Sequence, residues 1–592
     1  MQDGQTQNTL TGRVFFTFCT LILATSLAFA GPSQTSPKQV KISPDLKEAN
    51  LSGQIDVIVQ FKQVPTTTFH QKVLSRGGKI KTDLGQFKGG AYTMPVSALT
   101  DLASDPDVVY ISPDRPLNGA SQSSTPATLD YHTAAINAPA AWAEGLNGAG
   151  VGVALIDSGI ALNSDISPFN VIYNQDFTGA FLGSAADQFG HGTHVAGILA
   201  GTGATSTGPK FTYTFHGIAE NVNLINLRVL DQNGAGTDSQ VIAAIQQAIA
   251  LKSLFNIRVI NLSLGRPVWE SYTTDPLCQA VEQAWKAGIV VVVAAGNYGR
   301  DNNAGTNGYG TITAPGNDPY VITVGAMNTK STAARNDDVI ASYSSKGPAL
   351  FDQVIKPDLV APGNRIISIY SPWEALSQEY PGNIIPKSLY ETNNGAAASG
   401  NYFILSGTSM AAPTVSGAAA LMLQQSPSLT PDQVKARLMK TAFKNLQQSS
   451  TATDPDSGIT YYDQADIFTV GAGYLDIEAA LADSDLAPAI AGSAMSPTAT
   501  VDSTGNIVLV PNGSSVLGGN SAFWGAAASY GSSVLWGTSV SGRSVLWGSS
   551  SLEGESVLWS TSVVESDSVL WGTSVLWGSS ASTPELNIDG DN

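Results

Sequence analysis

Between residues 131 and 483 the chain alternates short apolar runs with helical patterns, and this alternation restricts its fold more than any other feature. Five runs are apolar almost throughout, as strands buried on both faces of a parallel sheet are: VGVALI, VNLINLRVL, RVINLSL, IVVVVAA and YVITVGA. The segment DSQVIAAIQQAIALK places Val241, Ile245 and Ile249 on one face of a helix. We therefore predict an α/β fold with a doubly wound parallel sheet and helices on both faces.

The first thirty residues have the pattern of a secretory signal peptide. Arg13 precedes an apolar stretch, residues 14–29, and the tripeptide AFA closes it. A positive charge, a short apolar core and an A-x-A site together indicate export, and the stretch is short for a membrane span. We predict that residues 1–30 are a signal peptide and that the protein is secreted or held at the cell surface. A hydrophobic N-terminal helix is the alternative.

Changes in composition divide the rest of the chain. A linker, 31–53, leads to a small module, 54–117, in which strand patterns (IDVIVQF, VVYISP) and helix patterns (TTTFHQKVLSRGG, SALTDLASDP) mix as in a compact α+β unit. Residues 118–130 (NGASQSSTPATLD) have the composition of a second linker. The main domain is expected over 131–483. The region 484–592 is poor in helix signals and rich in Ser, Gly and Val.

A tryptophan repeat marks this last region. SVLWG or SVLWS begins at residues 533, 544, 556, 568 and 574, and the units from 556 onward follow a six-residue register. Six is a multiple of two, so Val and Trp of every unit share one face of an extended chain. Short strands separated by turns, or a small β-solenoid, are the structural candidates, and a flexible Gly/Ser tail is the alternative. We expect a module that binds the cell surface or a protein partner.

Charge and cysteine content exclude some functions. Lys and Arg number 29 against 47 Asp and Glu, a net charge of −18, which disfavours nucleic-acid binding. Cys19 lies in the predicted signal peptide, so Cys278 has no partner for an internal disulfide. We interpret Cys278 as a buried structural thiol.

Three segments place reactive side chains at strand ends and helix starts. Asp157 directly follows a buried strand, His191 stands between two glycines before a helical run, and Ser409 precedes a helix of small apolar residues. Taken alone, the Asp suits a turn and the Ser a helix cap. A zinc pair of His191 and His194 lacks the Glu of the known motifs. Together the three residues supply a nucleophile, a base and an orienting carboxylate.

The three segments, DSG, HGTHVAG and SGTSMAAP, resemble closely the signature segments of the subtilisin-like serine peptidases (subtilases). The resemblance implies a catalytic triad of Asp157, His191 and Ser409. It also implies that Asn297, at the end of VVVAAGN, donates its side-chain amide to the oxyanion, with the Ser409 backbone N–H as the second donor.

The resemblance further implies where an extended peptide substrate binds. Two strands would sandwich it, and a third segment would line the wall of the first side-chain pocket, with Thr313 near its base. The implied substrate-binding residues are Gly234, Ala235, Gly236, Ser263, Leu264, Gly265, Ala294, Ala295 and Gly296.

The chain also departs from the family pattern. The family often carries a calcium-binding loop between Gly201 and His216, but here that loop has no carboxylate. Asp165 could match one calcium ligand of the family, but a lone carboxylate is more often a solvated turn residue, and we interpret it so. A structural calcium ion is possible, and its ligands stay unassigned. No cofactor is needed for the chemistry. The segment 364–405 is longer than a minimal subtilase requires, and we expect an extra surface loop there.

These inferences combine into one functional hypothesis. The module 54–117 resembles the family's inhibitory propeptide, which acts as an intramolecular inhibitor until it is cut, and the cut is expected within 118–130. We expect an exported serine endopeptidase that acts on polypeptides and is made as an autoprocessed zymogen. The alternative is a catalytically silent surface or adhesion protein that presents the Trp repeats. An esterase is disfavoured because G-x-S-x-G is absent around Ser409.

Overall fold

A computed structural model describes twelve stretches of the chain: 41–48, 53–119, 131–179, 184–303, 305–392, 400–454, 458–501, 507–517, 545–547, 557–559, 569–570 and 591. All of them belong to one unit, Lys41–Asn592. The predicted signal peptide and most of the predicted processing linker lie outside the described residues. Within these stretches, no helix has the length and apolar character needed to cross a membrane.

A largely parallel sheet forms the centre of the main domain, as predicted. Its order is β14-β13-β12-β10-β6-β8-β7, β15 pairs with β13, and only the β13–β14 pair is antiparallel. The strands are β6 (Gly152–Asp157), β7 (Val171–Asp176), β8 (Asn223–Arg228), β10 (Ile257–Leu262), β12 (Val290–Ala294), β13 (Ile322–Asn328), β14 (Val339–Ile340) and β15 (Leu359–Pro362). The innermost strands are fully buried because helices cover both faces.

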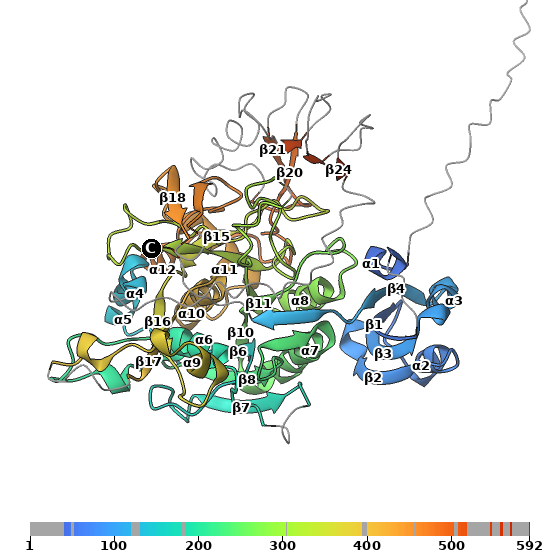
Figure 1. Ribbon diagram of the computed structural model, residues 1–592, viewed down its shortest axis with the longest axis horizontal. Helices are drawn as coiled ribbons and strands as arrows, with labels where there is room; N and C mark the ends of the chain where they lie inside the picture. Colours follow the sequence, from blue (N-terminus) through green and yellow to red (C-terminus); the bar gives the residue numbers. More distant parts are fainter. Residues whose placement is uncertain are drawn as a thin grey trace, which may run out of the picture. The chain divides into compact units, whose positions relative to one another are not determined.

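Two pairs of long helices flank this sheet (Figure 1). On one face α6 (His191–Ala200) packs against α10 (Thr408–Gln425), and on the other α7 (Asp238–Phe255) packs against α8 (Pro276–Lys286). Capping side chains fix where the second pair begins: Thr237 and Gln240 form a capping box on α7, and Asp275 caps α8. Shorter elements complete the domain: α4 (His132–Ala135), α5 (Ala138–Ala143), α9 (Ala375–Glu379), α11 (Pro431–Thr441), α12 (Ile477–Ala482), β16 (Ile366–Ile369), β17 (Tyr402–Leu405), β18 (Ser449–Thr453) and β19 (Thr460–Gln464).

The N-terminal module is an α+β unit with its own core. An antiparallel sheet of order β2-β3-β1-β4 packs against two helices. The elements are β1 (Gln54–Phe61), α2 (Thr67–Leu74), β2 (Lys79–Leu84), β3 (Gly89–Pro95), α3 (Leu99–Ser104) and β4 (Val108–Pro113). The module starts earlier than predicted, because α1 (Pro44–Glu48) buries Leu46 in this core and Ile42 bridges to Ile111. Part of the predicted linker 31–53 therefore belongs to the module.

The chain that leaves the module adds a strand to the main domain. β5 (Pro116–Gly119) pairs antiparallel with β9 (Ala235–Thr237) on one side and with β11 (Leu264–Gly265) on the other. The first residues of the predicted processing linker are thus part of a sheet.

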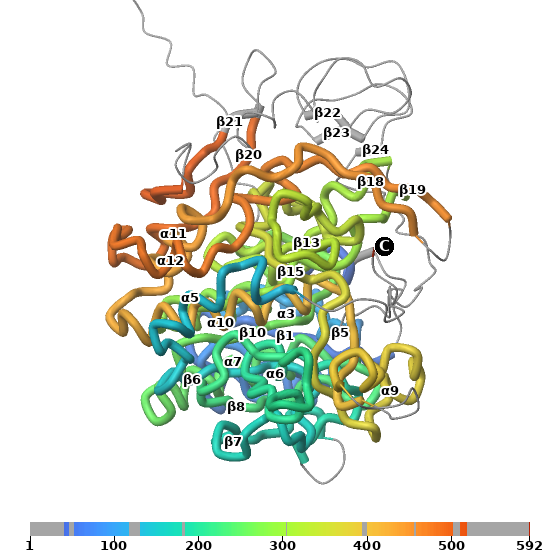
Figure 2. The backbone as a smooth tube through the Cα atoms, turned by 90° about the vertical axis from the view of Figure 1, so that its left-hand side faces the viewer, coloured from blue at the N-terminus to red at the C-terminus, as the bar shows by residue number. Residues whose placement is uncertain are grey.

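The folded core continues past the predicted boundary at residue 483. Ala494, Ala499 and Leu517 are buried in a cluster with Met439 and Phe468 of the main domain. A hairpin of β20 (Thr498–Val501) and β21 (Ile507–Val510) lies within this extension, which follows α11 and α12 in Figure 2. The prediction that the repeat region begins at 484 is therefore wrong: residues up to 517 complete the domain, and the small residues AGSAM gave no strong periodic signal for them.

Three copies of the repeat form a small parallel sheet. β22 (Val545–Trp547), β23 (Val557–Trp559) and β24 (Val569–Leu570) align Val545 with Val557 and Val557 with Val569. The stacking step is therefore twelve residues, two of the six-residue units read from the sequence. In-register parallel stacking at a fixed step is the pattern of a solenoid rather than of hairpins. The units that begin at 533 and 574 lie outside the described residues.

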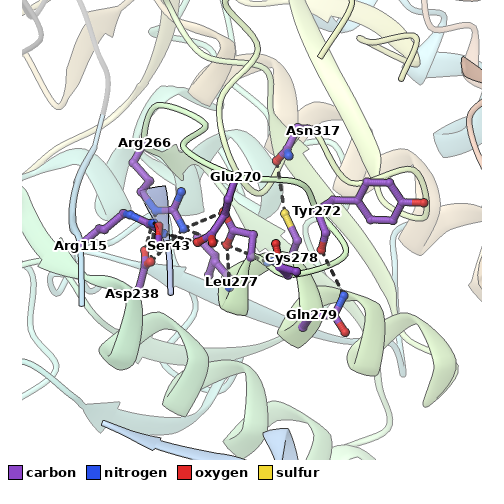
Figure 3. A network of polar contacts seen from close by, with 12 residues as sticks. Ser43, Arg115, Asp238, Arg266, Glu270, Tyr272, Leu277, Cys278, Gln279 and Asn317 are labelled. Carbon is purple, nitrogen blue, oxygen red and sulfur yellow. Dashed lines mark hydrogen bonds and ion pairs between the residues drawn. The ribbon is translucent and has the colours of Figure 1, made fainter. Parts of the chain in front are cut away.

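A buried network of charges ties the module to the main domain (Figure 3). Arg115, directly before β5, donates to Asp45 of the module (3.0 Å) and to Glu270 of the main domain (2.7 Å). Its neighbour Arg266 donates to Asp238 and Asp275 at the starts of α7 and α8. Burial raises the pKa of Glu270 to about 7 and that of Asp238 to about 6, although the arginines oppose this shift. Such charges are tolerated only while they remain paired.

This network gives a first testable prediction. We expect Arg115→Met to lower the free energy of unfolding by about 3–5 kcal/mol, because Glu270 is left buried without its partner. Urea unfolding of the full chain measures the change, with Ser409→Ala in every variant so that the module stays attached. Arg76→Met is the matched control: it removes an ion pair with Asp101, whose side chain is 68% exposed, so we expect about 0–1 kcal/mol. Equal effects of the two substitutions would show that the network does not hold the module.

Candidate active site

Asp157 and His191 meet at the carboxyl edge of the central sheet. Asp157 is the last residue of β6 and His191 is the first residue of α6. The His191 Nδ1–H donates to Asp157 Oδ1 over 2.7 Å, and the Ser158 N–H donates to the same oxygen. Both side chains are fully buried. The carboxylate therefore fixes the imidazole so that Nε2 is the nitrogen that can accept a proton.

Glycine at position 192 allows this approach. A Cβ on Gly192 would lie 2.3 Å from the Gly159 carbonyl oxygen and 3.2 Å from Asp157 Oδ1. Any other residue would push α6 away from β6. The Gly192 N–H instead donates to Ser158 Oγ over 2.8 Å, which joins the helix start to the strand end.

Ser409 is held by a reciprocal pair of hydrogen bonds with Ser263. The Ser409 hydroxyl donates to the Ser263 carbonyl (3.0 Å), and the Ser263 hydroxyl donates to the Ser409 carbonyl (2.8 Å). The second bond exists because Pro413, four residues after Ser409 in α10, has no N–H to offer the Ser409 carbonyl. The serine thus sits in the first turn of α10, whose exposed N–H groups favour negative charge.

The amide of Asn297 is oriented by the residue before the serine. Thr408 donates to Asn297 Oδ1 twice, from its backbone N–H (2.9 Å) and from its hydroxyl (3.0 Å). The same hydroxyl accepts the Gly296 N–H (3.1 Å). Because Oδ1 is occupied, the Nδ2 group is the end of Asn297 that remains to bind an oxyanion.

Two buried carboxyl groups stand behind His191. Thr193 Oγ1 lies 2.7 Å from Asp187 Oδ2 and 2.5 Å from Glu374 Oε1. Burial raises the pKa of Asp187, and burial together with the charge of Asp187 raises the pKa of Glu374 well above its usual range. The Thr193 hydroxyl has one hydrogen, so it can donate to only one of the two carboxyl groups. We assign that hydrogen bond to Asp187, and we assign Glu374 as a neutral acid that donates its own proton to Thr193 Oγ1.

The second histidine of the motif has a structural role. Burial lowers the pKa of His194 to about 3, so its ring is neutral, and its Nε2–H donates to the Phe403 carbonyl over 3.0 Å. No group of three or more His, Cys, Asp or Glu in the described part of the chain could hold a metal ion.

Asp165 does not fit a calcium site. It was interpreted as a solvated turn residue, but it is fully buried. Its carboxylate accepts the Thr205 N–H (2.7 Å), the Thr205 hydroxyl (3.0 Å) and the Tyr402 hydroxyl. Protein donors thus occupy both oxygens, and the interpretation as a solvated residue is wrong. The loop from Gly201 supplies hydroxyl and amide donors where a calcium site would need oxygen acceptors.

The residues implied for substrate binding surround β5. Ala235 and Gly236 lie in β9, Leu264 and Gly265 form β11, and both strands pair with β5. The remaining implied residues adjoin these strands: Gly234 precedes β9, Ser263 precedes β11, Ala294 ends β12, and Ala295 and Gly296 follow it.

Thr313 lies against two of the glycines implied for substrate binding. A Cβ on Gly265 would lie 2.6 Å from Thr313 Oγ1, and one on Gly296 would lie 2.7 Å from Thr313 Cγ2. The threonine therefore packs against Gly265 and Gly296. Its place at the base of a substrate pocket stays a prediction.

Some contributors were not found from the sequence. Thr408 and Pro413 lie inside the serine motif, but their roles appear only in three dimensions. Thr408 donates to Asn297, and Pro413, which has no N–H, leaves the Ser409 carbonyl to accept from Ser263. Glu374 lies in the segment 364–405, expected as an extra surface loop. That expectation is wrong for much of the segment: β16 and β17 pair with each other, and Glu374 is 1% exposed. Residues 393–399 of it lie outside the described part of the chain.

A nucleophilic serine, a histidine paired with a buried aspartate, and an oriented amide donor at one edge of a parallel sheet define a serine hydrolase. The family follows from comparison with known proteins. The model of the Subtilase family matches residues 148–471, more than half of the chain, and the chain belongs to this family.

Individual relatives agree with the family match. The chain is 40% identical to the serine protease AprX of Bacillus subtilis over 323 residues, which cover 53% of this chain and 66% of AprX. It is 34% identical to subtilisin E of the same species over 389 residues, 65% of this chain and 84% of that protein. Among solved structures, fervidolysin from Fervidobacterium pennivorans has a similar fold, with a TM-score of 0.53 and 21% identity over 79% of this chain and 66% of the other.

The protonated Glu374 gives a second prediction. Its raised pKa means that the folded state holds the proton more tightly than the unfolded state does, so stability is lost as pH rises above the usual glutamate range. We expect Glu374→Gln, which keeps a neutral donor, to retain the fold and to flatten the decline in stability between about pH 5 and 8. Thermal unfolding against pH measures this. Exposed Glu379→Gln is the control and should leave the profile unchanged. A Glu374→Gln variant that loses stability at every pH would refute the neutral assignment.

Proposed function

We propose that the chain is an exported serine endopeptidase made as an autoprocessed zymogen. One observation carries the proposal: the strand that leaves the N-terminal module is paired on both sides, with β9 and with β11, and β11 directly follows Ser263, whose carbonyl accepts the Ser409 hydroxyl. An extended peptide held by backbone pairing on two sides is how such a cleft would present a peptide bond. The similarity to subtilisins supports the peptidase chemistry.

The geometry supports a conventional acyl-transfer sequence. Ser409 Oγ turns from the Ser263 carbonyl to His191, gives its proton to Nε2 and attacks the carbonyl carbon of the peptide. Asp157 stabilises the imidazolium that forms. The oxyanion is bound by Asn297 Nδ2 and the Ser409 N–H, and it collapses as His191 protonates the leaving amine. Water then hydrolyses the acyl-enzyme by the reverse proton path.

Inhibition by the module depends on several contacts besides β5. Asp114 accepts the backbone N–H (2.8 Å) and the hydroxyl (2.7 Å) of Ser239 in the first turn of α7, so the module supplies part of that helix's cap. Gln60 donates to the Thr274 carbonyl over 2.7 Å, and Arg115 bridges Asp45 and Glu270. Ser409 and His191 are fully buried in the chain that carries the module. We propose that the module covers them and acts as an intramolecular inhibitor.

The register of β5 against β11 indicates which peptide bond would be cut. Asn118 pairs with Gly265 and Gly119 with Leu264, the last described residues of this strand pair. We propose that a bound peptide keeps this register for one more residue, which would stand opposite Ser263. The Ser263 carbonyl is 3.0 Å from Ser409 Oγ. We therefore propose cleavage between Ala120 and Ser121, within the predicted linker 118–130.

Specificity is expected to come from side chains on this register. Leu117 pairs with Gly236 and is fully buried, so an apolar side chain suits that position of a substrate. Thr313 would limit the size of the residue at the cut. The alternative, a silent surface protein that presents the Trp repeats, has no use for the oriented Asn297 amide or for the reciprocal Ser263–Ser409 bonds. Export through residues 1–30 and surface or partner binding by the repeats remain parts of the proposal.

Autoprocessing provides the test. We expect the purified wild-type chain to lose its N-terminal module, to begin at Ser121 and to hydrolyse casein. Ser409→Ala should keep the module and be inactive, because the nucleophile is gone. Exposed Ser428→Ala should behave as wild type. N-terminal sequencing and casein assays measure these results. Equal processing of wild type and Ser409→Ala would refute autoprocessing, and a different new N-terminus would refute the register.

A further inference from the structure

Asp591, the second-to-last residue of the sequence, is fully buried against the main domain. Its Oδ1 accepts hydrogen bonds from Arg300 (2.8 Å) and from the Ser342 hydroxyl (2.6 Å), and its Oδ2 accepts the Ser342 N–H (2.6 Å). Asn364 binds the main chain of Asp591 in both directions, donating Nδ2–H to its carbonyl and accepting its N–H, each over 2.9 Å. Five directional contacts thus converge on one residue.

The site is built for an acidic residue in this orientation. Arg300, whose side chain is 8% exposed, is also held by Ser342 Oγ (2.8 Å) and Asp454 (3.1 Å). A guanidinium fixed in this way presents a charge that a carboxylate matches and an amide does not. Without the carboxylate, the Ser342 N–H would be a buried donor with no acceptor, which costs stability.

We propose that Arg300, Ser342 and Asn364 form a docking pocket for Asp591 of the same chain, which anchors the segment after the tryptophan repeats to the main domain. Leu517, the last described residue before the repeats, is also fully buried. The repeats are therefore joined to the domain at both ends and are presented as a loop instead of a free tail. This inference does not depend on the proposed peptidase activity.

The pocket lies on the segments that support the oxyanion site. Arg300 is three residues after Asn297. Ser342 is three residues before Ser345, whose N–H donates to the Gly296 carbonyl and whose hydroxyl accepts the Tyr298 N–H.

Asn364 adds a third connection to the same site. It follows Gly363, whose carbonyl accepts the Gly407 N–H over 2.9 Å, two residues before Ser409. Docking of Asp591 therefore joins three segments whose relative positions set the oxyanion donor and the nucleophile.

Hydrogen exchange tests the anchor in the full chain. In a Ser409→Ala background, which prevents self-cleavage, we expect Asp591→Ala to speed exchange of the Ser342 amide by about tenfold or more. Asp591→Asn should have a smaller effect, because it keeps one acceptor. Asp589→Asn, the same change two residues away, is the matched control and should leave the amide protected. An unchanged Ser342 amide in folded Asp591→Ala would overturn the proposal.

A peptide in trans makes the test independent of the variant's stability. We expect the peptide ELNIDGDN (residues 585–592) to restore protection of the Ser342 amide in Asp591→Ala, and the same peptide with Asn in place of the second Asp to restore much less. Protection in the parent chain should not change with dilution. If neither peptide restores protection of the Ser342 amide, the pocket does not recognise the acidic side chain. If protection in the parent chain falls on dilution, Asp591 docks between chains and not within one chain.

Discussion

The pairing of β5 between β9 and β11 is the constraint on which the rest of this structure depends. A strand paired on both sides fixes the register of the chain that leaves the module, and its partner β11 directly follows Ser263, whose carbonyl accepts the Ser409 hydroxyl. To hold that strand, Arg115 is drawn into a buried network with acids from both sides of the module contact. The energetic cost of burying these charges is offset only while the module remains docked. The inhibitor that we propose would therefore be released more readily when a single charged partner is lost.

The candidate site is constructed mainly from backbone positions. Gly192 lets α6 approach β6, and Pro413 leaves the Ser409 carbonyl to Ser263. Thr408 orients Asn297 with two hydrogen bonds. Each of these three residues helps to place a reactive group without a further charged side chain. Of the two carboxyl groups that contact Thr193, we assign that of Glu374 as neutral, and Asp157 is the carboxylate that accepts the His191 N–H.

Much of this architecture could be predicted from the sequence, because strong apolar periodicity specifies buried parallel strands and the signature segments are short and contiguous. Asp157, His191, Ser409 and Asn297 all lie in such segments. Other features could not be predicted. Asp165 looks like an isolated turn carboxylate until Thr205 and Tyr402 approach it in three dimensions. The extension to residue 517 is built from small residues without periodicity, and the twelve-residue step of the repeats arises from pairing between strands. Contacts of high sequence separation, such as Arg300 with Asp591, leave no local signal at all.

The central claim is that Ser409 is an activated nucleophile that the module keeps covered until processing. Labelling with a serine-directed fluorophosphonate during maturation tests it most directly. The account expects no adduct on the uncleaved chain, and one adduct on the processed chain that maps by peptide mass to the segment containing Ser409. Labelling of the uncleaved chain at the same rate, or a processed chain that never labels at Ser409, would contradict it.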